Sequence, residues 1–82
     1  MAKQRKIPAA VLRAGAWLAE NYGGNDRFRF LGMHDGAEVW LFQFAGEVDF
    51  GFPQVWLYKS GRAVAVEDMA AVRLVASMRP KD

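Results

Sequence analysis

The residues that could do chemistry are few in this chain of 82 residues. His34 is the one histidine, and the carboxylates of Asp35 and Glu38 lie close to it in sequence. An imidazole with acidic neighbours could bind a metal ion or move a proton, but His34 also precedes an Asp-Gly pair, which is typical of a two-residue hairpin turn. We therefore interpret His34 as a turn residue and predict no metal site and no cofactor.

The remaining nucleophiles and acids form no arrangement typical of an active site. The chain has no cysteine, which excludes disulfides, thiolate catalysis and cysteine-based metal sites. Glu67 and Asp68 are explained as the N-terminal cap of a helix. Gly23 and Gly24 follow a predicted helix, whereas a phosphate-binding loop follows a strand. We therefore expect the protein not to be an enzyme.

The net charge of +2 is concentrated at the N-terminus. Lys3, Arg5 and Lys6 lie within the first six residues, and the rest of the chain has eight basic against nine acidic residues. We predict a flexible basic tail over residues 1–6 and a single domain over residues 7–82. A membrane-spanning helix needs about 20 consecutive apolar residues, and no stretch of this sequence approaches that length. The apolar stretch after the tail is too short for a secretion signal. We expect a cytoplasmic protein without a membrane partner.

Hydrophobic periodicity predicts a helix at each end of the chain and four strands between them. Apolar residues spaced by three or four predict helices over residues 8–22 and 69–78. Apolar and polar residues alternate, or apolar residues run together, over the stretches 27–31, 37–45, 52–59 and 62–66. These elements predict a two-layer α+β domain in the order α-β-β-β-β-α, with a four-stranded, mainly antiparallel sheet and two helices packed on it.

Two turns set the expected strand register. Asp35-Gly36 and Ser60-Gly61 both fit two-residue hairpin turns, in which glycine adopts a positive φ without steric cost. In the first hairpin Leu31 should then face Trp40, and in the second Leu57 should face Val64.

This register gives the sheet two apolar faces, one of them dominated by large aromatic side chains. We favour an arrangement in which both helices pack on the other face, and the alternative places one helix on each face. The favoured arrangement leaves the aromatic face open. Because 52% of the residues are apolar, the chain holds more apolar surface than a monomer of this size can hide.

The favoured function is therefore a small interaction module that self-associates as a homodimer, or binds another protein, through the aromatic face. Large aromatic side chains dominate the binding energy of many interfaces. The predicted interface residues are Leu31, Trp40, Phe42, Phe44, Trp56 and Tyr58.

Two alternatives stay open from the sequence. Arg27 and Arg29 could hold phosphates while Trp40 and Trp56 stack bases, which would make the face a site for single-stranded nucleic acid, although the body of the chain is slightly acidic. A small molecule could instead bind under the loop 46–53, which contains phenylalanines at positions 50 and 52.

Overall fold

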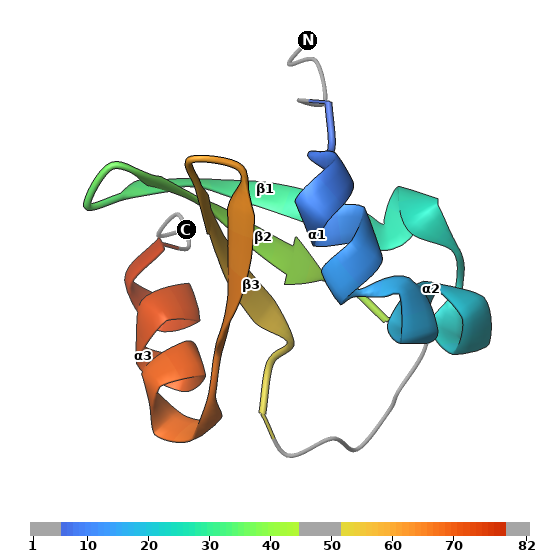
Figure 1. Ribbon diagram of the computed structural model, residues 1–82. Helices are drawn as coiled ribbons and strands as arrows, with labels where there is room; N and C mark the ends of the chain where they lie inside the picture. Colours follow the sequence, from blue (N-terminus) through green and yellow to red (C-terminus); the bar gives the residue numbers. More distant parts are fainter. Residues whose placement is uncertain (1–5, 45–51, 79–82) are drawn as a thin grey trace, which may run out of the picture.

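A computed structural model of the chain describes residues 6–44 and 52–78 (Figure 1). Its helical elements are α1 (Ala9–Ala14), α2 (Ala16–Tyr22), the 3₁₀ turn η1 (Asn25–Arg27) and α3 (Asp68–Met78). Its strands are β1 (Phe28–His34), β2 (Ala37–Phe42), β3 (Val55–Lys59) and β4 (Arg62–Val66). The predicted α+β class and the order of helices and strands are confirmed. The basic tail up to residue 5 and the loop from 45 to 51 lie outside the described residues.

The four strands form an antiparallel meander in the order β1-β2-β3-β4. Both hairpins close with the two-residue turns that the sequence predicts. Asp35 and Gly36 have φ values of 50° and 80°, and Ser60 and Gly61 have φ values of 54° and 79°. Two positive φ values in succession define the type I′ turn, whose twist matches that of the flanking strands.

The register of the second hairpin is confirmed. That of the first is confirmed from the turn to the pair Gly32 and Val39, but it is wrong by one residue beyond that pair. Trp40 pairs with Phe30 instead of Leu31, because the ladder contains a bulge between Phe30 and Gly32. One extra residue in a strand moves every residue beyond it to the opposite face of the sheet. The bulge thereby turns Phe28 and Phe30 toward the aromatic face, and Leu31 packs in the aliphatic cluster on the other face.

The helices lie on opposite faces of the sheet, so the expectation that both cover one face is wrong (Figure 1). The α1–α2 pair covers the aromatic face, where the buried cluster is Val11, Leu18, Ala19, Phe28, Trp40, Phe42 and Trp56. Helix α3 covers the aliphatic face, where the buried cluster is Val39, Val55, Ala71, Leu74 and Val75. Because the bulge adds two phenylalanines to the aromatic face, both faces carry enough apolar surface to hold a helix against the sheet.

The predicted N-terminal helix is divided at Gly15. Its hydrogen bonding continues across the division, since the Gly15 N–H donates to the Val11 carbonyl at 2.9 Å and the Gly15 carbonyl accepts from Ala19 at 3.0 Å. A Cβ atom at Gly15 would lie 2.6 Å from two ring atoms of Phe28 and 3.1 Å from the ring of Trp56. The helical backbone therefore rests directly on the aromatic rings, and only glycine allows so close an approach.

Candidate functional site

The aromatic side chains that the sequence predicts as an interface lie mostly in the interior. Trp40, Phe42 and Trp56 have exposed fractions of 0%, 1% and 6% beneath α1 and α2. The other three members of the set are half-buried: Leu31, Phe44 and Tyr58. A partner could reach the three buried rings only if the N-terminal helices left the sheet.

The buried aromatic side chains contact one another within the protein. The rings of Phe30 and Trp40 pack with centroids 5.5 Å apart, and those of Phe28 and Phe42 meet edge to face at 5.1 Å, which is a favourable geometry for aromatic pairs. The indole Nε1 of Trp40 donates a hydrogen bond to the Glu38 carboxylate at 2.9 Å. No buried side-chain nitrogen or oxygen of the described residues lacks a partner.

Both arginines of the nucleic-acid alternative bind backbone carbonyls. Arg27 donates from Nε to the Gln43 carbonyl at 3.0 Å and from Nη2 to the Phe44 carbonyl at 3.1 Å. Arg29 donates from Nη1 to two carbonyls at the start of β1. The Arg27 guanidinium group thereby ties the segment after β2 to the residue that precedes β1, whereas Arg29 binds the Asp26 and Phe28 carbonyls of its own segment. Trp40 and Trp56, on which this alternative would stack bases, are buried and cannot serve as that platform in this structure.

His34 lies at the tip of the first hairpin, next to the turn. Its Nε2 is 3.6 Å from the Oδ2 atom of Asp35, and both side chains are exposed. Within residues 6–44 and 52–78, no group of three or more acidic or histidine side chains is placed to hold a metal ion. The same residues contain no helix long and apolar enough to cross a membrane.

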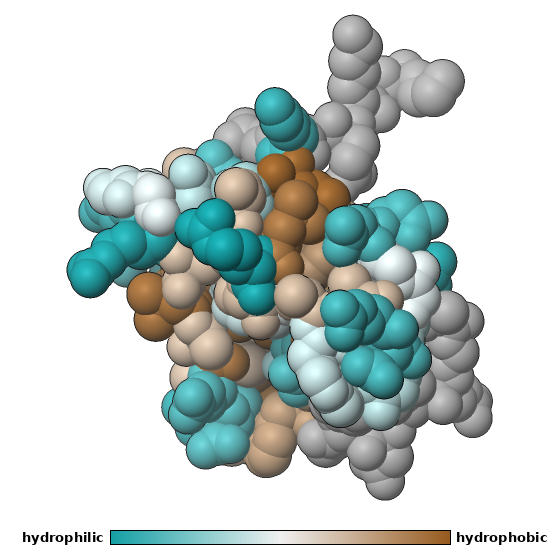
Figure 2. Space-filling view, turned by 45° about the vertical axis from the view of Figure 1, so that its right-hand side comes forward, coloured by the Kyte–Doolittle hydropathy of each residue, from teal (hydrophilic) through white to brown (hydrophobic). Residues whose placement is uncertain are grey.

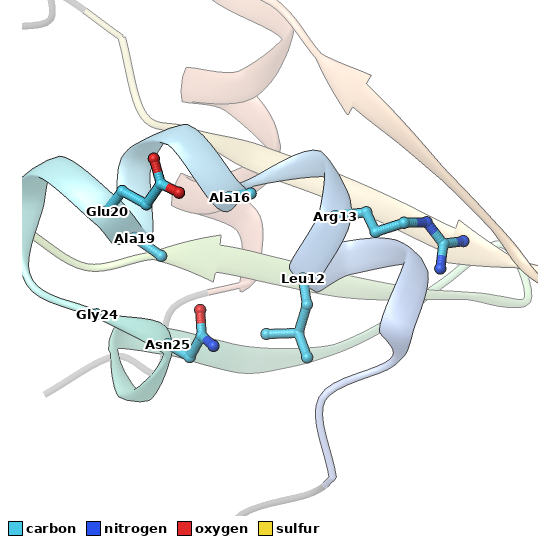
Figure 3. A pocket seen from close by; sticks show the side chains of 7 residues that line it. All are labelled: Leu12, Arg13, Ala16, Ala19, Glu20, Gly24 and Asn25. Carbon is cyan, nitrogen blue, oxygen red and sulfur yellow. The ribbon is translucent and has the colours of Figure 1, made fainter.

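A hollow of about 440 Å³ lies between the N-terminal helices and the segment that follows them (Figure 3). Its lining residues are Leu12, Arg13, Ala16, Ala19, Glu20, Gly24 and Asn25. Leu12 and Asn25 point toward one another across it, whereas the guanidinium group of Arg13 extends away (Figure 3). Small-molecule sites combine an apolar lining with polar groups that converge on the ligand. This hollow lacks that convergence, and we assign it no ligand.

The most accessible apolar surface of the sheet is on β4, which forms one edge of the meander. Val64, in the middle of this strand, has an exposed fraction of 60%, and Ala65 is also exposed. In a hairpin with a two-residue turn, the residue next to the turn and every second residue after it direct their N–H and C=O groups toward the partner strand. The residues between them direct these groups away from it. The N–H and C=O groups of Ala63 and Ala65 therefore point out of the sheet, and they have no backbone partner among the described residues.

The two edges of the sheet differ in how well they are protected. Along β1, the bulge before Gly32 interrupts the ladder, and Arg29 places a charge on the strand. Bulges and charges are the usual devices that keep an edge from pairing with another strand. The stretch from Ala63 to Val66 has no proline, charge or bulge. By these criteria β4 is the less protected of the two edges.

An apolar groove of about 490 Å³ runs beside β4 on the face that α3 covers only in part. Its floor contains Leu57, Val64 and Ala37, and its rim is polar. On the face that Figure 2 shows, hydrophobic and hydrophilic residues lie side by side. The sequence does not show whether the two hairpins lie side by side, so the position of β4 at an edge follows only from the observed strand order.

Comparison with protein-family models, with curated proteins and with solved structures found no match for this chain.

Proposed function

We propose that this chain is a small, non-enzymatic protein-interaction module and that its contact surface is the free edge of β4. The partner is an extended protein segment that adds to the sheet as a further strand. In this binding mode backbone hydrogen bonds supply affinity, and side chains on alternate positions supply specificity.

The exposed and unprotected state of β4 is the observation that carries the proposal. An edge strand that is apolar from Ala63 to Val66, with Val64 60% exposed, is open to pairing with another strand. The groove beside β4 would receive side chains of the added strand from the same face as Val64 and Leu57. The buried aromatic face is not part of the proposed contact.

A library of displayed eight-residue peptides tests the proposal. Peptides selected on the wild-type protein should lose binding to Val64→Lys, because a lysine on the edge strand opposes the approach of another strand. The matched control is Met33→Lys, which puts the same charge at an exposed position of β1, where 54% of the side chain is accessible.

Amide exchange locates the contact independently. A bound peptide should slow the exchange of the Ala63 and Ala65 amide protons and leave that of Met33 unchanged. A library that yields no binding peptide, or peptides that bind Val64→Lys as tightly as the wild type, would contradict the proposed function.

A further inference from the structure

We infer that β4 pairs with β4 of a second copy of this chain, antiparallel and with Val64 opposite Val64 of its partner. This inference rests on the proposed function and names the segment that occupies the edge. The two meanders would then form one continuous sheet across a twofold axis.

Backbone geometry favours this register. In antiparallel sheets, residues opposite each other alternate between pairs that exchange two hydrogen bonds and pairs that exchange none. With Val64 on the twofold axis, Ala63 of one copy lies opposite Ala65 of the other, and these are the residues whose backbone groups point outward. A register centred on Ala63 would pair Ala65 with Gly61 of the turn, and a register centred on Ala65 would pair Ala63 with Glu67, which lies beyond the strand.

The charges at the two ends of β4 are complementary in the antiparallel direction. Lys59 and Arg62 stand at the turn end, whereas Glu67 and Asp68 stand at the other end, and all four are exposed. No ion pair within the described residues involves them. In the proposed register Arg62 lies opposite Val66 of the partner, at the end of the strand that leads into the acidic pair. A parallel arrangement would place like charges together.

The side chains at the centre also fit a close contact. Val64 would belong to a non-hydrogen-bonded pair, in which Cα atoms approach to about 4.5 Å and the side chains touch. The partner's valine would cover the most exposed apolar residue of the strand and would extend the groove across both copies.

A single cysteine at position 64 tests the inference, because the native chain has none. The Cα separation of a non-hydrogen-bonded pair lies within the range that a disulfide spans, about 4.4–6.8 Å. Val64→Cys should form a covalent dimer when treated with oxidised glutathione, as seen on a non-reducing gel. Met33→Cys, at a position of similar exposure on the other edge, should stay uncrosslinked or crosslink at least tenfold more slowly.

Light scattering during size-exclusion chromatography provides a test without a disulfide. The mass of the wild-type protein should rise toward that of a dimer as its concentration increases, whereas Val64→Lys should remain monomeric. Arg62→Glu should raise the dissociation constant of the dimer about fivefold, and added salt should reduce this difference. A wild-type chain that stays monomeric at all concentrations, or equal crosslinking of both cysteine variants, would overturn the inference. If peptides still selected β4 in that case, the proposed function would stand with a foreign partner.

Discussion

Gly15→Ala is the substitution that tests most sharply how the N-terminal helices sit on the sheet. Helix propensity alone predicts that alanine stabilises a helix by about 1 kcal/mol relative to glycine. The structure predicts the opposite sign, because the new methyl group would lie 2.6 Å from two ring atoms of Phe28 and 3.1 Å from the ring of Trp56.

The magnitude follows from the burial of those rings. Phe28 and Trp56 have exposed fractions of 0% and 6%, so neither ring can swing into solvent to make room. Adding a methyl group to a well-packed core costs about 1–3 kcal/mol, and contacts this short with two rigid rings fall in the upper part of that range. After subtraction of the propensity gain, we expect Gly15→Ala to lower the free energy of unfolding by about 1–2 kcal/mol.

Urea unfolding, followed by tryptophan fluorescence and far-UV circular dichroism, measures this change. Ala16→Gly is the matched control for helix propensity. Because Ala16 is exposed, this substitution should lower the free energy of unfolding by only about 0.5–1 kcal/mol. In a Phe28→Leu background, which removes the ring edge, the penalty of Gly15→Ala should shrink, giving a coupling energy of about 1 kcal/mol. If Gly15→Ala stabilised the protein as propensity predicts, the close approach of the helical backbone to the rings would be refuted.

Substitutions at three further positions test the core and the turns. Trp56→Ala should cost about 3–5 kcal/mol, because it opens a large cavity under α1 and α2, and a loss below 1 kcal/mol in urea unfolding would contradict the burial of this ring. Glu38→Ala should cost about 1–3 kcal/mol by leaving the Trp40 indole N–H without its acceptor, whereas Glu38→Gln, which keeps an oxygen, should cost less than half as much in the same assay. Ser60→Asn should raise the melting temperature by a few degrees, since asparagine tolerates the positive φ of 54° better than serine, and a lower melting temperature would argue against the type I′ turn.

Local chemistry predicted the turns but could not predict the bulge. Asp35-Gly36 and Ser60-Gly61 fix their backbone conformation within two residues, so their sequence is sufficient. Counting outward from the first turn assumes a regular ladder, and the bulge next to Gly32 breaks that assumption. A glycine inside a strand pattern is the available signal, because it often marks a bulge.

The burial of the aromatic face depended on information that periodicity does not contain. An apolar stripe shows that a helix packs on something, but it does not say on which face of a sheet. The division of the N-terminal helix at Gly15 was likewise invisible, since it depends on the rings that meet it from distant strands. The candidate edge was missed for the same reason: exposure of Val64 follows from strand order and is not a property of the strand itself.

The cover of the aromatic face by the first two helices has a consequence for how the chain matures during synthesis. These helices, of six and seven residues, are made before the strands that they cover, yet they are too short to persist alone in water. The rings on which they pack come from β1, β2 and β3, and the last of these rings, Trp56, leaves the ribosome after Phe28 and Trp40. Until then Phe28 and Trp40 have no complete cover, and this interval is when the nascent protein is most exposed to aggregation and to capture by chaperones.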